Sequence, residues 1–79
     1  MDELEIGKVY RHFKGNYYLL LDTALHSETQ EVFVVYKALY GDCKTWVRPL
    51  KMFLEKINQN KPDNITGQNH RFERVDKIC

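Results

Sequence analysis

Histidine, carboxylate and hydroxyl side chains gather at His26-Ser27-Glu28-Thr29, and a second histidine, His12, precedes a predicted turn. A histidine beside a carboxylate and a hydroxyl can perform acid–base or nucleophilic chemistry. Adjacent residues of an extended chain point to opposite sides, however, and Ser, Glu and Thr in turns usually bond nearby backbone groups. The pattern therefore favours local turn structure. A small-ligand or enzymatic site around His12, His26 and Glu28 is the third-ranked hypothesis.

Aromatic and arginine side chains form a second candidate set: Tyr10, Arg11, Tyr17, Tyr18, Tyr36, Tyr40, Trp46 and Arg48. Rings beside a guanidinium pack against peptides or stack on bases. Trp46 and Arg48 are two positions apart in a predicted strand, so they should share one face. The alternative is that the rings are core residues and cross-strand pairs. The residues proposed for binding, from both sets, are Arg11, His12, His26, Glu28, Tyr36, Trp46 and Arg48.

The charge balance leaves two ligand classes open for the aromatic and arginine set. Lys plus Arg is 12 and Asp plus Glu is 11, which excludes a strongly basic nucleic-acid arm and an acidic tail. A protein or peptide partner is the first hypothesis, and it requires an exposed Trp46. Single-stranded nucleic acid or a nucleotide is the alternative. It requires Arg11, Arg48 and at least two lysines on the aromatic face.

Motifs that identify an enzyme or a cofactor site are not found: there is no phosphate-binding glycine loop, dinucleotide fingerprint or zinc-protease helix motif. Cys43 and Cys79 stand far apart, and with three scattered histidines they give no metal-ligand spacing. We therefore predict a non-catalytic binding module with no cofactor and no metal, while the sequence leaves the question of catalysis open.

Positioning these residues requires a β-rich scaffold, because most of the chain reads as short extended runs with tight turns between them. Gly15-Asn16, between the first two runs, predicts a hairpin with a type II′ turn. In the third run, alternation places Val32, Val34, Tyr36 and Ala38 on one face. The extended runs are expected over residues 8–14, 17–25, 31–40, 44–47 and 70–75.

A short helix is expected between the last two runs. Pro49 ends the fourth run, because proline has no N–H to donate, and proline also suits the first turn of a helix. Apolar residues then recur at helical spacing from Leu50 to Ile57, which predicts about two turns. The polar, turn-rich segment 58–69 is expected to be an exposed, mobile loop.

The expected fold is therefore mostly β: a small SH3-like, partly open barrel of about five antiparallel strands with one short helix before the last strand. The alternative is an α+β sheet covered by one helix. The 79 residues, 1–79, amount to a single domain, and a homodimer would add buried surface that a domain of this size lacks. No apolar run is long enough for a membrane span, and the acidic start is unlike a secretory signal, so we expect a cytoplasmic protein.

Four segments resemble, in the same order, a widespread family of small bacterial proteins catalogued as a domain of unknown function. They are Tyr10–Tyr18 (YRHFKGNYY), His26–Thr29 (HSET), Val34–Gly41 (VVYKALYG) and Trp46–Phe53 (WVRPLKMF), with a weaker match at Arg71–Glu73. The resemblance implies a small, mostly standalone bacterial cytoplasmic protein, and it implies no reaction, cofactor or substrate. Residues 58–69 depart from the family pattern, so nothing is carried over to that loop.

Overall fold

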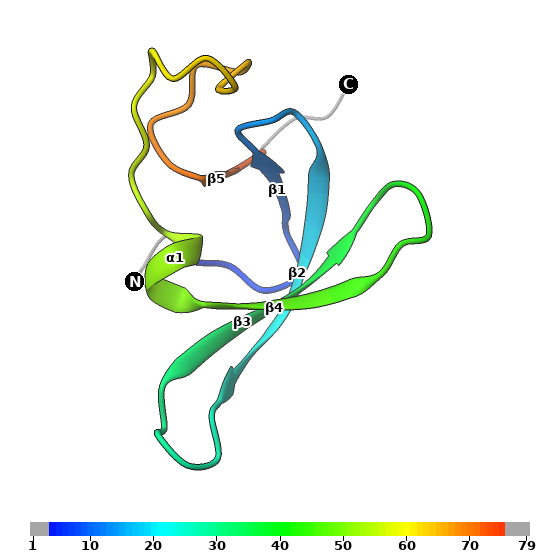
Figure 1. The fold of residues 1–79 in the computed structure, drawn as a ribbon. Helices are drawn as coiled ribbons and strands as arrows, with labels where there is room; N and C mark the ends of the chain where they lie inside the picture. Colours follow the sequence, from blue (N-terminus) through cyan, green and yellow to red (C-terminus); the bar gives the residue numbers. More distant parts are fainter. Residues whose placement is uncertain (1–3, 76–79) are drawn as a thin grey trace.

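The sheet contains five antiparallel strands in the order β4-β3-β2-β1-β5, in a computed structural model that describes residues 4–75. The mostly β prediction, with a short helix before the last strand, is confirmed (Figure 1). The α+β alternative is not supported, because the helix has a single turn. The elements are β1 (Val9–His12), β2 (Tyr17–Leu25), β3 (Val32–Ala38), β4 (Thr45–Pro49), α1 (Leu50–Phe53) and β5 (Phe72–Arg74).

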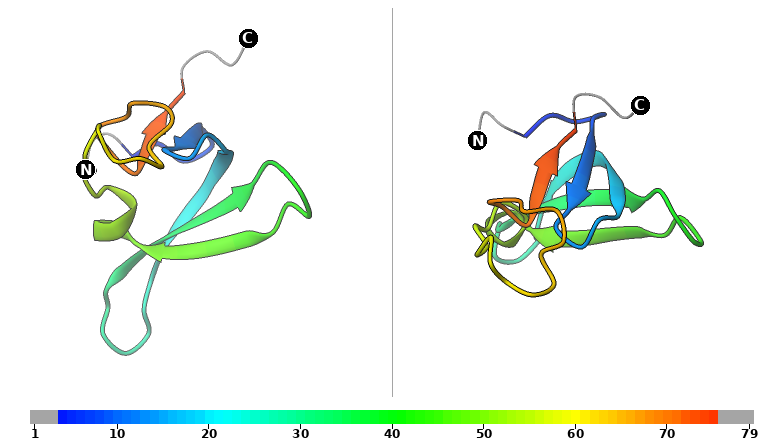
Figure 2. Two further views of the ribbon diagram at one scale, coloured as in Figure 1. Left: turned by 45° about the horizontal axis from the view of Figure 1, so that its top comes forward. Right: turned by 90° about the horizontal axis from the view of Figure 1, so that it is seen from above.

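The sheet curls strongly, so that the β3–β4 hairpin runs crosswise to β1 and β5 (Figure 2). The strand that makes this bend is β2, which pairs with β1 at its start and with β3 along nearly its whole length. Its register with β3 shifts between Leu20 and Asp22, a bulge that bends and twists the strand. The bulge explains why residues 17–25 lack a clean alternation of polar and apolar side chains.

The core lies on the inner face of the curled sheet, which is the face that carries Tyr10, Leu20, Val34 and Tyr36. The alternation predicted for the third run is confirmed for Val34, Tyr36 and Ala38, which are buried. Val32, at the start of β3, is only partly buried. The open side of the sheet is closed by Phe53 of α1, whose ring stacks on Phe72 of β5 at 4.2 Å between centroids. A one-turn helix therefore completes the core with one fully buried side chain, beside the partly buried Leu50.

The first hairpin is confirmed, but its turn differs from the predicted one. The N–H of Gly15 bonds the carbonyl of His12 at 2.7 Å, and the N–H of His12 bonds the carbonyl of Asn16 at 2.8 Å. The loop is therefore Phe13-Lys14-Gly15, with the positive φ of 104° at its third residue, a three-residue hairpin loop rather than a two-residue type II′ turn. The reason is Phe13, which is 1% exposed and so turns inward instead of extending the strand.

The helix is shorter than predicted, because the chain leaves it to pair with the segment before β5. It ends after Phe53, although the apolar spacing continues to Ile57. The carbonyl of Glu55 accepts the N–H of Arg71 at 2.8 Å, and the N–H of Ile57 bonds the carbonyl of Asn69 at 2.9 Å. These non-local bonds replace the bonds of a second helical turn. The boundary at Pro49 is confirmed, since this residue ends β4 and directly precedes α1.

The polar segment 58–69 was expected to be exposed throughout, and this is wrong for two of its residues: Asn64 is 8% exposed and Gln68 is 3% exposed. The Asn64 amide nitrogen donates to the carbonyls of Asn58 (3.1 Å) and Gln68 (2.9 Å). Its oxygen accepts the backbone N–H groups of Gly67 (3.0 Å) and Gln68 (3.2 Å). The loop therefore folds around one buried amide, in keeping with the rule that buried polar groups are hydrogen-bonded.

Candidate binding surface

The inner face of β4 carries Trp46 and Arg48, as the two-residue spacing predicts. In the register with β3, Trp46 lies opposite Tyr36 and Arg48 opposite Val34, and both partners are core residues. Trp46 nevertheless remains 49% exposed, because β4 is the outer strand at this end of the sheet. The peptide hypothesis required an exposed Trp46, and the structure meets that condition.

Arg48 is held in place by aromatic residues. Its Nε donates to the hydroxyl of Tyr36 at 3.2 Å, and its guanidinium lies over the Phe72 ring, 5.8 Å from the centroid. Within residues 4–75, no carboxylate forms an ion pair with it. Arg48 is therefore an oriented positive charge whose remaining N–H groups are available to an anion.

Two tyrosines from separate hairpins meet beside Arg48. The hydroxyls of Tyr18 and Tyr40 are 2.6 Å apart, and the Tyr18 ring packs edge-on against Tyr36 and Phe72. Burial and the bond to Tyr40 raise the pKa of Tyr18, so the Tyr18 phenol stays protonated at neutral pH. The two hydroxyls share one hydrogen bond and hold two protons, so one O–H remains available to donate to a ligand.

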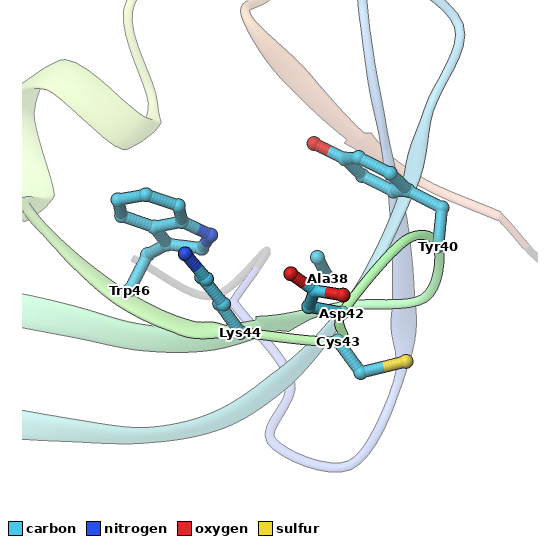
Figure 3. Close-up of a pocket in the computed structure, with 6 residues that line it drawn as sticks. All are labelled: Ala38, Tyr40, Asp42, Cys43, Lys44 and Trp46. Carbon is cyan, nitrogen blue, oxygen red and sulfur yellow. The ribbon is translucent and has the colours of Figure 1, made fainter.

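A hollow lies between the rings of Trp46 and Tyr40, with Ala38 between them (Figure 3). The β3–β4 turn supplies its rim through Asp42, Cys43 and Lys44. It contains about 290 Å³ of empty space, part of which is open solvent. Because part of this space is open solvent, the hollow has room for one side chain and not for a large cofactor. We call Tyr18, Tyr40, Trp46 and Arg48, together with this hollow, the aromatic surface.

His12 borders the aromatic surface from the side of β1 and β5. Its ring stacks on Phe13 at 4.4 Å and meets the edge of Phe72 at 4.9 Å between centroids. Its Nδ1 accepts the N–H of Lys14 at 3.1 Å. Burial, then the positive charges of Arg71, Arg48 and Lys14, lower the pKa of His12 to about 4. The imidazole is therefore neutral at physiological pH and cannot act as a proton donor of ordinary histidine acidity.

Residues 8–74 match the family described as "Protein of unknown function (DUF1653)". This chain belongs to the DUF1653 family. A crystal structure of a protein belonging to DUF1653 from Bordetella bronchiseptica is similar to it over 100% of this chain and 96% of that chain, with 36% sequence identity and a TM-score of 0.75. The family resemblance seen in the sequence is confirmed. No curated protein matches the chain.

His26, the second histidine proposed for binding in this DUF1653 protein, lies in the β2–β3 turn and forms hydrogen bonds within that turn. Its Nδ1 accepts the N–H groups of Glu28 (3.1 Å) and Thr29 (3.3 Å). The turn follows Leu25 at the far end of β2, seven positions beyond Tyr18, where His12 packs. At a rise of about 3.3 Å per residue that is up to about 23 Å along the strand. His12 and His26 are not brought together, so the third-ranked hypothesis lacks the convergence it required.

Arg11 is also separated from the aromatic surface. It alternates with Tyr10 and His12 on β1 and so faces the other side of the sheet. Its Nε donates to Oε1 of Gln68 at 2.9 Å, and Nε2 of Gln68 donates to the carbonyl of Arg11 at 2.9 Å. The nucleic-acid hypothesis required Arg11 and Arg48 on one face, and the fold places them on different ones.

Several residues at the surface do not follow from the sequence pattern alone. Lys44 had a signal, since it stands two positions before Trp46 and the period of two continues to it. Asp42 lies beyond the end of β3, where no strand period applies. Tyr40 belongs to the aromatic and arginine set, but for the same reason no period placed it beside Trp46. Phe72 comes to Arg48 only through the pairing of β5 with β1. Its contribution follows from strand order and not from any local pattern.

The described part of the chain adds two findings on metals and membranes. No group of three or more His, Cys, Asp or Glu side chains within residues 4–75 could hold a metal ion. No helix of that segment is long and apolar enough to cross a membrane. Cys43 is an exposed free thiol, and Cys79 lies outside the described residues.

Proposed function

We propose that this DUF1653 protein is a small non-catalytic binding module that takes a segment of a protein partner on its aromatic surface. The observation that carries the proposal is the exposure of two large rings at one hollow: Trp46 is 49% exposed and Tyr40 is 44% exposed. Exposed aromatic side chains beside an arginine are the residue types that dominate binding energy at protein interfaces.

Pre-organisation of the surface supports the same function. The hydroxyl pair joins Tyr18 to Tyr40, and Arg48 is bonded to Tyr36. Side chains that are already ordered lose little conformational entropy when a ligand binds, so more of the contact energy appears as affinity. The ordered rings beneath the surface would therefore reduce the entropy that is lost when a partner binds.

The strand order also supports the SH3-like, partly open barrel that the sequence predicts. The sheet runs β4-β3-β2-β1-β5, and a one-turn helix separates β4 from β5. Barrels of this type bind peptides in aromatic-lined grooves. The expected partners are cytoplasmic proteins.

The proposal is tested by selecting peptides from a random displayed library on the wild-type protein and on two variants. Trp46→Ala removes the exposed ring, and we expect it to abolish enrichment of the sequences that the wild type selects. Val47→Ala is the matched control, because Val47 is 60% exposed on the opposite face of the same strand. Equal enrichment on Trp46→Ala and the wild type would contradict the proposal, as would the absence of any enriched sequence.

A second titration distinguishes the ligand classes. Short single-stranded oligonucleotides are added at two salt concentrations while the NMR resonance of the Trp46 indole is followed. We expect no shift, because nucleic-acid binding requires Arg11 beside Arg48 and Lys44, and Arg11 lies on the other face of the sheet. A shift that shrinks as salt is raised would replace the peptide function with nucleic-acid binding.

A further inference from the structure

The backbone of β4 has one unused edge. β4 is an outer strand of the sheet, and β3 is its neighbour on the other side. The N–H of Ala38 bonds the carbonyl of Lys44 at 2.9 Å, so this pair and every second pair after it bond across the ladder. Trp46 and Arg48 therefore point their backbone groups at β3, while Thr45 and Val47 point theirs at the free edge.

The inner-face side chains of β4 continue an alternating series that begins at Lys44, the residue just before the strand. Lys44, Trp46 and Arg48 follow one another at two-residue intervals, about 6.6 Å apart on an extended chain. Neither Lys44 nor Arg48 forms an ion pair with a carboxylate in the part of the chain that the structure describes. The series therefore reads cation, indole, cation, beside a free backbone edge.

We propose that the ligand is an extended peptide that adds to the free edge of β4 as a sixth strand. It presents an acidic, an apolar and an acidic residue at alternate positions, on the side of the aromatic surface. This proposal rests on the proposed function and names the ligand class and the binding mode. The two carboxylates lie opposite Lys44 and Arg48, and the apolar side chain lies beside Trp46. Directly opposite residues of paired strands interact most strongly when their charges are opposite or their surfaces apolar.

Pro49 sets the length of the added strand. Proline has no N–H, so the edge offers the backbone groups of Thr45 and Val47 and then stops. With so few main-chain bonds available, affinity depends on the side-chain series, and the order of residues in the peptide should matter more than its composition.

The test uses two blocked peptides of equal composition. The first carries Glu-Thr-Leu-Thr-Glu, flanked by serines. The second exchanges the first Glu with its neighbouring Thr, which moves one carboxylate to the opposite face of an extended chain. We expect the first peptide to bind about tenfold more tightly, as followed by the Trp46 indole resonance. Its binding should also slow hydrogen exchange at the amides of Thr45 and Val47.

Charge reversal provides a second readout. Lys44→Glu should weaken binding of the first peptide by about tenfold. It should also restore binding to a peptide whose glutamate opposite residue 44 is replaced by lysine. Lys8→Glu is the matched control, because it makes the same charge change at an exposed position on the approach to β1, away from β4. We expect it to leave both affinities unchanged.

The outcomes separate this proposal from the proposed function. If both peptides shift the Trp46 indole equally, or if Thr45 and Val47 exchange as fast as before, peptide binding stands and strand addition is wrong. If neither peptide binds while displayed sequences of another pattern depend on Trp46, the acidic-apolar-acidic class is wrong. If no peptide of any pattern depends on Trp46, the proposed function itself fails.

Discussion

Two regions of this protein bury their residues by opposite means. The aromatic cluster of Tyr10, Tyr36, Phe53 and Phe72 excludes water with large apolar surfaces, and Phe53 is 0% exposed at its centre. The 58–69 loop excludes water around Asn64, whose side chain makes hydrogen bonds in several directions. The cluster draws on the hydrophobic effect, which is roughly proportional to buried area, whereas the loop draws on directional bonds.

The difference shows that the two regions support different parts of the protein. The cluster lies directly beneath the aromatic surface, since Tyr36 and Phe72 contact Arg48. The loop instead covers the β1–β2 turn, where the N–H of Ile65 bonds the carbonyl of Phe13 at 3.1 Å. Damage to the cluster should therefore be global and should reach the binding surface, while damage to the loop should stay local.

The largest expected effect is that of Phe53→Ala. Removing this buried ring should cost about 3–5 kcal/mol of unfolding free energy, a large share of the stability of a domain this small. Urea denaturation followed by Trp46 fluorescence measures it. Met52→Ala is the control, because Met52 is next to Phe53 in the chain and is 45% exposed. This substitution should change the free energy of unfolding by less than about 0.5 kcal/mol. If the Phe53→Ala variant does not fold, the smaller change Phe53→Leu is used to measure the loss of unfolding free energy. A cost for either variant no larger than that of the control would contradict the central role of Phe53.

Asn64→Ala should have the next largest effect, about 2 kcal/mol, because it leaves buried backbone groups without partners. Hydrogen exchange should accelerate at the amides of Gly67 and Gln68 and stay unchanged in β2 and β3. Asn60→Ala, at an exposed position of the same loop, should be close to neutral. Faster exchange throughout the sheet would show that the loop and the aromatic cluster form one cooperative unit, and would contradict a local effect.

Tyr36→Phe isolates the hydroxyl that joins the cluster to Arg48. We expect a loss of about 1 kcal/mol, the net value of one hydrogen bond, together with greater mobility of the Arg48 side chain. Urea denaturation and NMR relaxation at Arg48 Nε measure the two effects. Tyr17→Phe is the control, because Tyr17 is 37% exposed. An unchanged Arg48 would mean that the Phe72 ring alone holds the guanidinium.

His12 lies between the two regions and gives the smallest expected effect, a dependence of stability on pH. Its pKa is about 4 in the folded protein and about 6.5 in the unfolded chain, so the unfolded chain binds the proton first. Stability should be complete above pH 6.5 and should fall as the pH is lowered toward 4. Partial exposure screens the effect to less than about 1 kcal/mol. In His12→Phe, denaturation between pH 6.5 and 4 should show a shallower slope, and an identical slope would contradict this assignment.

The predictability of the fold varied with the range of the interactions involved. The β3 alternation and the boundary at Pro49 depend on neighbouring residues, and both were correct. The apolar spacing through Ile57 predicted a second helical turn, which lost to bonds between residues 55–57 and 69–71. The prediction that the 58–69 loop is exposed was wrong at Asn64 for a related reason. The composition of the loop is that of a solvated segment, and nothing in the local sequence shows that Asn64 is enclosed.

The features of the candidate surface also differ in whether local sequence predicts them. The shared face of Trp46 and Arg48 followed from strand geometry alone, whereas the assembly of His12, His26 and Glu28 did not occur because their strand ends are far apart. That Tyr18 would meet Tyr40, or Phe72 meet Arg48, was set by the curl of the sheet and the pairing of β5 with β1. Local sequence determines backbone conformation and which face a side chain takes. Which faces then meet depends on contacts between distant residues, because only the whole set of strands decides how the sheet closes.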